Sequence, residues 1–101
     1  MRLRPALERR LGQVRAEVLG LREELRVLEE QASFQSGVAD EVAGQAVAAG
    51  TPLADRERQV AQDDARRVQR ERDETAERLR SLLDEQDLLL ERLLERQGGT
   101  T

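Results

Sequence analysis

Apolar residues recur along this chain at alternating spacings of four and three, which is the repeat of a coiled-coil helix. In the first half the repeat comprises Leu7, Leu11, Val14, Val18, Leu21, Leu25, Leu28 and Ala32, and its phase continues through Gln35, Ala39, Val42 and Ala46. In the second half the same spacing connects Ala54, Arg58, Ala61, Ala65, Val68, Arg72, Thr75, Leu79, Leu82, Gln86, Leu89 and Leu93. The sequence therefore predicts two long helices that pack together through a seam of a and d heptad positions.

The segment Gly50-Thr51-Pro52 separates the two repeats and has the residues of a helix end followed by a helix start. Glycine adopts the left-handed conformation that closes many helices, and threonine is a good N-cap. Proline suits the first helical position, because its fixed φ fits a helix and its missing N–H would have no partner there. We therefore expect helices over about 3–49 and 52–97, joined by a turn at 50–52.

The two repeats share one register if the helices run antiparallel. The numbers of the facing residues then add up to 100 in each layer, as they do for Leu7 and Leu93. The rival arrangement, a parallel dimer of two continuous helices, puts the Gly-Thr-Pro segment inside a helix at a cost of about 3 kcal/mol or more. The predicted fold is all-α, an antiparallel two-helix coiled-coil hairpin that forms a single domain over 1–97, with a disordered tail at 98–101.

A second point at which the first helix can end is the segment Ser33-Phe34-Gln35-Ser36-Gly37. Serine and glycine are weak helix formers, so a break near 36–37 would leave residues 38–49 as a separate short helix. The heptad phase nevertheless continues across this segment, and a true break has no reason to preserve it. We favour a first helix that is unbroken or only kinked there.

Composition excludes most catalytic and nucleic-acid-binding classes. The chain has 17 basic and 21 acidic residues, a net charge of −4, and neither cysteine nor histidine, so it lacks thiolate nucleophiles, imidazole bases and the usual zinc ligands. Charges of both signs are interspersed, and no basic stripe is available for nucleic acid or an anionic membrane. No apolar run approaches the roughly 18 residues of a membrane span. We expect a soluble, cytoplasmic protein that is not an enzyme and binds no cofactor, metal, nucleic acid or membrane.

The seam is rich in leucine near the chain ends and rich in alanine near the turn, where we expect it to open most easily. Near the chain ends, one flank carries additional leucines beside the seam: Leu19, Leu83, Leu90 and Leu94. Two hairpins can pair through this flank into a four-helix bundle, which would bury more apolar area than one seam provides. The alternative is that these leucines only widen the seam within one chain. We favour a homodimer, or burial against a helical protein partner.

The opposite flank of the first helix carries Val27, Phe34 and Val38, at spacings that place them on one helix face. Phe34 is the only aromatic residue of the chain, and buried aromatic side chains commonly anchor protein interfaces. The sequence therefore indicates a partner anchor at these three residues. The alternative is an ordinary apolar residue at the surface, near a kink in the helix.

Four carboxylates flank the predicted turn: Asp40, Glu41, Asp55 and Glu57. Carboxylate oxygens are the ligands that Mg²⁺ prefers. Asp55 and Glu57 equally suit the first turn of a helix, where the helix dipole favours negative charge. We interpret the four as contact residues of the turn end of the hairpin rather than as metal ligands.

Charged residues at the edges of the seam are only partly complementary in this register. It places Arg10 opposite Arg92 and Glu17 opposite Glu85, so that like charges face each other. These mismatches predict that charges from outside this chain complete the pattern.

The run Pro52-Leu53-Ala54-Asp55-Arg56 at the turn resembles the tip of DksA. A two-helix coiled coil with carboxylates near its tip is similar to the hairpins of the DksA and Gre families of bacterial transcription factors, and this resemblance implies a tip that inserts into RNA polymerase. The chain has neither the zinc-finger cysteines typical of DksA nor the length for the second domain of a Gre factor. Only the architecture of the hairpin carries over.

Glu29 and Ser33 match the first two places of Glu-x3-Ser-x2-Arg-x3-Gln-x3-Asp, the motif with which RsiG-type anti-sigma hairpins bind cyclic di-GMP. Ser36 stands where that motif has arginine, so nucleotide binding is not carried over, and the resemblance leaves a sigma factor or another helical protein as the partner. All 17 basic residues are arginine, and in this the chain resembles short coiled-coil proteins of high-GC bacteria.

These features together predict a protein–protein interaction module, or adaptor, that presents a helical hairpin to a larger partner. The alternative is a transcription regulator that binds RNA polymerase or a sigma factor.

Overall fold

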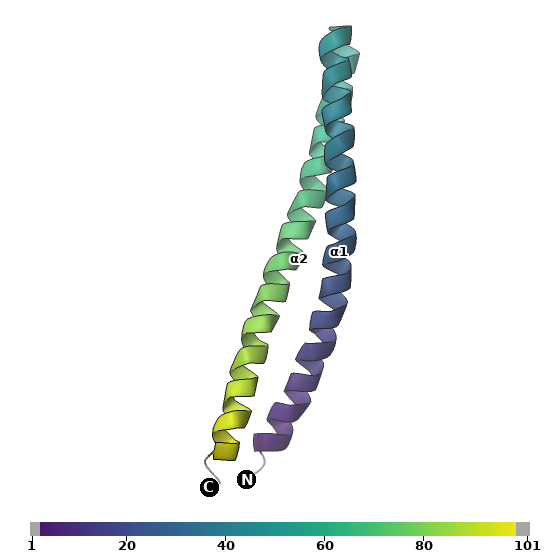
Figure 1. The fold of residues 1–101 in the computed structure, drawn as a ribbon. Helices are drawn as coiled ribbons and strands as arrows, with labels where there is room; N and C mark the ends of the chain where they lie inside the picture. The colour runs from purple at the N-terminus through teal and green to yellow at the C-terminus, as the bar shows by residue number, and fades with distance from the viewer. Residues whose placement is uncertain (1–2, 99–101) are drawn as a thin grey trace. The chain divides into compact units, whose positions relative to one another are not determined.

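The computed structural model describes residues 3–98, which form two helices (Figure 1). Helix α1 spans Leu3–Ala49 and helix α2 spans Pro52–Gly98, with Gly50 and Thr51 between them. The predicted all-α hairpin of two helices is confirmed, and α2 ends one residue later than expected. Apart from Gly98, the predicted tail lies outside the described residues.

Helix α1 is continuous through the segment at which a break near 36–37 was the alternative. Every a and d position named above is buried or half-buried, on both helices. The heptad phase of α1 therefore passes through Gln35 and Ala39 without interruption. Packing of the seam outweighs the weak helix propensity of Ser36 and Gly37.

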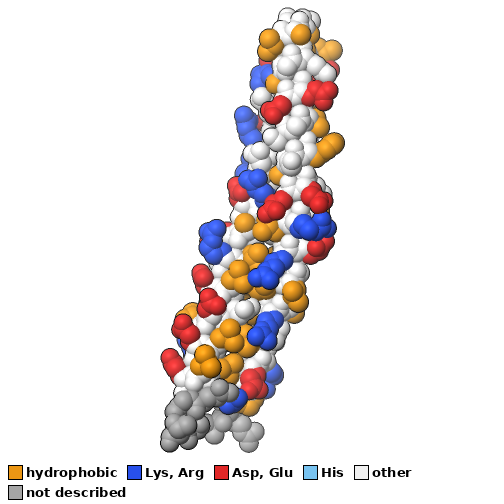
Figure 2. Space-filling model, viewed as in Figure 1, with side chains coloured by type: hydrophobic (Ala, Val, Ile, Leu, Met, Phe, Trp, Pro, Cys, Tyr) orange, Lys and Arg blue, Asp and Glu red, His pale blue; other side chains and the backbone are white. Residues whose placement is uncertain are grey.

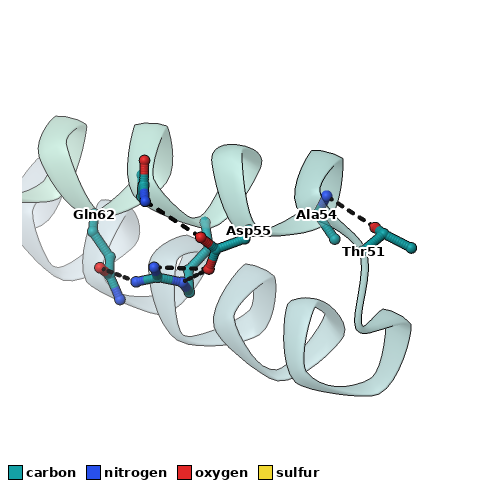
Figure 3. Close-up of polar contacts among 6 residues, drawn as sticks. Thr51, Ala54, Asp55 and Gln62 are labelled. Carbon is teal, nitrogen blue, oxygen red and sulfur yellow. Dashed lines mark hydrogen bonds and ion pairs between the residues drawn. The ribbon is translucent and has the colours of Figure 1, made fainter.

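The turn between the helices is built as the sequence predicts. Gly50 has a φ of 63°, in the left-handed region, and its N–H donates to the carbonyl oxygen of Ala46 at 3.0 Å. The Thr51 hydroxyl accepts a hydrogen bond from the backbone N–H of Ala54 at 3.2 Å, which caps the first turn of α2 (Figure 3). The backbone N–H of Asp55 donates to the Thr51 carbonyl at 3.1 Å and begins the helical ladder.

The chain divides by packing into two units, each containing one stretch of α1 and one of α2. The terminal unit runs to Glu23 on α1 and begins again at Ala76 on α2, whereas the turn unit is the continuous segment Glu24–Thr75. The two units differ in the side chains that form their cores.

The core of the terminal unit consists of large aliphatic side chains. Its buried members are Leu11, Val14, Val18, Leu21, Leu82 and Leu89, and the half-buried Leu7, Leu79, Leu83, Leu90 and Leu93 pack against them. Val14 is completely buried, with 0% of its surface exposed. Burial of such a side chain contributes about 1.5–3 kcal/mol, so this core is the main apolar contribution to stability in the unit.

The core of the turn unit is made largely of small side chains. Ala39, Ala61 and Ala65 are buried and the half-buried Val42 packs against them, while Leu28 and Ala32 are buried further from the turn. An alanine buries far less apolar area than a leucine does, so each of these layers contributes less to stability. The weakening of the seam toward the turn stays a prediction, because it rests on the area that these side chains bury.

An ion pair joins the two helices of the terminal unit at the edge of the seam. Arg10 Nε donates to Glu85 Oε2 at 2.6 Å and a second guanidinium nitrogen donates to Oε1 at 2.8 Å. The hydrogen bond from Arg10 lowers the pKa of Glu85, and the same bond raises the pKa of Arg10. The prediction that external charges neutralise these mismatches is wrong for this pair, because the long Arg10 side chain reaches Glu85 instead of facing Arg92.

Candidate functional site

The turn unit exposes apolar side chains on one flank, away from the seam. Phe34 is 69% exposed on α1, and Val60 on α2 is 61% exposed. Val38 is half-buried and Val27 is exposed on the same flank of α1. We call Val27, Phe34, Val38 and Val60 the Phe34 face. Figure 2 shows apolar side chains at the surface of the end that carries the turn, with acidic and basic side chains around them.

Heptad geometry explains why these residues share a flank. They occupy c and g positions, and in an antiparallel pair the g edges of the two helices lie on the same side of the seam. Val60 was missed in the sequence because a single valine between polar residues is unremarkable when α2 is considered alone. Its c position on the antiparallel partner helix is the signal that identifies it.

Two adjacent grooves lie along the Phe34 face. The first has a volume of about 330 Å³ and is lined by Gln35, Val38, Arg56, Glu57, Val60, Ala61 and Asp64. The second has a volume of about 450 Å³ and is lined by Glu30, Gln31, Phe34, Gln35 and Val68. Gln35 borders both, so the two grooves adjoin at this residue within the turn unit, and we call them together the recess.

The recess follows from the small residues of the seam. Ala61, a buried d residue, lies in the wall of the first groove, whereas the buried d residues of α2 in the terminal unit are the larger Leu82 and Leu89. A methyl group fills little of the space between two helices, so the flank is hollowed next to it. The small side chain of Ala61 therefore leaves room in the first groove for side chains of another molecule.

Asp55 is engaged in contacts within its own helix. Its carboxylate accepts hydrogen bonds from Arg58 Nε at 2.9 Å and from Gln59 Nε2 at 3.3 Å (Figure 3). Arg58 also donates to Gln62 Oε1 at 2.8 Å, so its guanidinium is held at the edge of the seam although it occupies an a position. Asp55 thus provides the carboxylate that neutralises an arginine at the edge of the apolar layer.

The structure does not bring the four predicted carboxylates of the turn end together. Asp40 lines a depression with Gln62 and Arg66 on one flank, and Glu57 lines the first groove on the other. Glu41 is exposed, at a c position on the Phe34 side of α1. Within residues 3–98 no three acidic side chains are close enough to hold a metal ion.

The four leucines predicted for self-association fall into two pairs. Leu83 and Leu90 are half-buried and pack against the core of the terminal unit, as the alternative of a wider seam requires. Leu19 and Leu94 are 67% and 65% exposed. Next to Leu19 on the same flank, a Cβ added at Gly12 would meet no atom within 4 Å, so the backbone is accessible to an approaching helix. Only Leu19 and Leu94 remain wholly available to a second molecule.

In the described part of the chain, neither helix has the length and apolarity that crossing a membrane requires. Comparison with known proteins finds no family model, no curated protein and no solved structure that matches this chain.

Proposed function

We propose that this chain is a non-enzymatic protein–protein interaction module of the cytoplasm, and that the Phe34 face is the surface that docks on a larger protein. The supporting observation is the position of its one aromatic side chain. Phe34 is 69% exposed and lines one groove of the recess, whereas the seam residues of both helices are buried or half-buried. Burial of an aromatic anchor in a partner contributes about 1.5–3 kcal/mol, which is enough to dominate a small interface.

The exposure of Phe34 has no role in the hairpin itself. The side chain belongs to neither core cluster, and the neighbouring seam layers are filled by Ala32 and Gln35. A residue that folding does not require, located beside a recess, is available for binding. We therefore assign stabilisation of the hairpin to the buried seam residues and partner binding to the exposed flank.

The cytoplasmic part of the proposal is supported by the absence of cysteine from the whole sequence. Small secreted domains with little core usually depend on disulfides, which this chain cannot form.

The second candidate function is regulation of transcription through RNA polymerase or a sigma factor. It is supported by the two-helix architecture and by the run Pro52-Leu53-Ala54-Asp55-Arg56 at the start of α2, the features on which the resemblance to the DksA and Gre hairpins rests. This candidate differs from the first in the identity of the partner and, for RNA polymerase, also in the surface, because the resemblance to the DksA and Gre hairpins implies binding through the tip.

The experiment is affinity capture from a lysate of the source organism with the full chain and two matched variants. Phe34→Ser removes the proposed anchor, and Leu88→Ser removes an exposed leucine from α2 in the terminal unit. We expect one protein to be recovered with the wild type and with Leu88→Ser but not with Phe34→Ser. Its identification as a polymerase subunit or sigma factor would favour the second candidate. Equal recovery with Phe34→Ser would contradict the proposed surface.

A further inference from the structure

The turn unit is strongly acidic, and the terminal unit is not. Twelve carboxylates and seven arginines lie between Glu24 and Thr75, a net charge of −5. The rest of the chain has nine carboxylates and ten arginines, a net charge of +1. The whole negative charge of the protein is therefore carried by the unit that contains the Phe34 face.

Within the turn unit the acidic residues concentrate on the flank of the Phe34 face. Its c and g positions contain the carboxylates Glu24, Glu41, Glu57, Asp64, Glu71 and Glu74. The only basic residue at these positions is Arg67, which already pairs with Asp64 at 3.0 Å. In the terminal unit the same positions have three carboxylates and three arginines. Acidic side chains therefore predominate on the flank that contains the apolar recess. This excess of carboxylates at c and g positions occurs in the turn unit and not in the terminal unit.

The residues that line the recess also include more acidic than basic side chains. Glu57 and Asp64 line the first groove beside Val38 and Val60, together with the basic Arg56, and Glu30 lines the second beside Phe34. Three carboxylates and one arginine therefore line the two grooves. No ion pair within the described residues involves Glu57, so its charge is available to a ligand. The surface therefore offers an apolar stripe bordered by carboxylates.

From this juxtaposition we infer that the Phe34 face binds a basic amphipathic α-helix of another protein. The inference rests on the proposed function and specifies the chemistry of its partner. Apolar residues of the partner helix enter the two grooves, and its lysines or arginines lie against Glu57 and the other carboxylates at the c and g positions that have no ion pair within the described part of the hairpin.

The geometry of the face fits a helix of about three turns. Val27 and Val38, with Phe34 between them, are eleven residues apart along α1, which is about 16 Å at 1.5 Å per residue. A third helix in the recess between two helices packs by the same ridges and grooves as a coiled coil. An added strand has no place here, because no sheet edge exists within residues 3–98.

The charge of the face also excludes other occupants. Nucleic acid and anionic membranes are repelled by clustered carboxylates. A second copy of the same face would oppose acid with acid, and the terminal unit is nearly neutral. A basic helix from a different protein is the occupant that satisfies both the apolar recess and its acidic border.

The test is a selection from a displayed library of helical peptides on the full-length chain. Every peptide carries leucine at i, i+4, i+7 and i+11, and its remaining positions are randomised among Lys, Arg, Glu, Gln and Ser. We expect the enriched peptides to be strongly basic beside the leucine stripe. Their affinity should fall on the order of tenfold in Phe34→Ser, as for an interface hot spot, and remain unchanged in Leu88→Ser.

Substitution of exposed carboxylates tests the inference independently, because it changes no residue of the seam. Glu41→Gln combined with Glu57→Gln should weaken the selected peptides several-fold at low salt, with a smaller effect at high salt. Asp40→Asn, on the opposite flank, is the matched control and should have no effect. Circular dichroism would verify that each variant has the helix content of the wild type.

The outcomes separate this inference from the proposed function. Enrichment of acidic or neutral peptides that still lose affinity in Phe34→Ser would overturn the basic partner and leave the docking surface in place. Peptides that bind Phe34→Ser as well as the wild type, or an absence of any enriched peptide, would overturn both.

Discussion

The guanidinium of Arg10 on α1 donates two hydrogen bonds to the carboxylate of Glu85 on α2, at 2.6 and 2.8 Å. The two side chains occupy g positions on facing helices, so the pair links the helices at the edge of the leucine seam. Two parallel hydrogen bonds to one carboxylate fix both the distance and the orientation of the partners. The pair therefore opposes sliding of one helix along the other within the terminal unit.

The first prediction concerns the pH dependence of stability. Because the hydrogen bond from Arg10 lowers the pKa of Glu85 in the folded state, its stabilisation is fully present above the unfolded pKa of about 4.3. It is lost as the pH falls through the lower, folded pKa. Thermal melting followed by circular dichroism should show a smaller drop in Tm between pH 7 and pH 3 for Glu85→Gln than for the wild type.

Two further variants test whether the change in Tm depends on the ion pair between Arg10 and Glu85. Arg10→Glu should lower the Tm at pH 7, because it places two carboxylates together, and the exchange Arg10→Glu with Glu85→Arg should restore much of the loss. Glu77→Gln, which removes an exposed pair within α2, is the control. Equal drops in Tm for the wild type and Glu85→Gln on acidification would contradict the assignment.

The second prediction concerns the core of the terminal unit. Val14→Ala removes two methyl groups from a completely buried side chain, and it should reduce the free energy of unfolding by about 1–3 kcal/mol. Leu88→Ala, in the same unit but with 54% of the side chain exposed, should change it by less than about 0.5 kcal/mol. Urea unfolding of the two variants measures the difference. Similar losses for both would show that Val14 does not lie in a packed layer.

Opposite effects are expected for two glycine-to-alanine substitutions. Gly50 has a φ of 63°, so Gly50→Ala should cost about 1–2 kcal/mol through the left-handed conformation alone. Gly44 lies inside α1 with no atom within 4 Å of an added Cβ, so Gly44→Ala should stabilise by about 0.5–1 kcal/mol. Urea unfolding should give a lower free energy of unfolding for Gly50→Ala, and a higher one for Gly44→Ala, than for the wild type. A stabilised Gly50→Ala variant would contradict the left-handed helix end.

The helices, the turn and the inward-facing residues of the seam could be predicted because each depends on local or periodic chemistry. A strict alternation of four and three residues permits only one helix face to be buried, and Gly50-Thr51-Pro52 combines three independent end signals. The structure confirms both features, and it shows that α1 is continuous where the serine and glycine residues left an alternative open.

The parts that could not be predicted depend on side-chain reach and on the neighbouring helix. Heptad register places Cα positions opposite each other, but an arginine can reach along the seam edge, so the pairing of Arg10 with Glu85 did not follow from it. Val60 joins the Phe34 face only when the second helix supplies it. The small seam residue Ala61 lies in the wall of the groove, a feature that no residue pattern in a single helix reveals.

The fourth prediction concerns local opening. The buried layers nearest the turn are alanines, whereas the terminal unit buries leucine and valine. Amide hydrogens of α1 around Ala39 should therefore exchange faster than those around Val14, because opening there exposes less apolar area. Hydrogen–deuterium exchange followed by mass spectrometry measures both segments in one experiment. Stronger protection around Ala39 than around Val14 would contradict this ranking.

The last prediction concerns self-association through the terminal unit. Leu83 and Leu90 are already half-buried in the core of the unit, so a dimer must rely on the exposed Leu19 and Leu94. We expect the mass measured by sedimentation equilibrium to rise from monomer to dimer with concentration, because pairing two such flanks buries leucine from each chain. Leu19→Glu should shift the equilibrium toward monomer by placing charges in the interface. Leu88→Glu, which changes an exposed leucine on the other flank, should leave it unchanged. A monomer mass at every concentration, up to the millimolar range, would exclude the dimer and leave the Phe34 face as the only proposed docking surface.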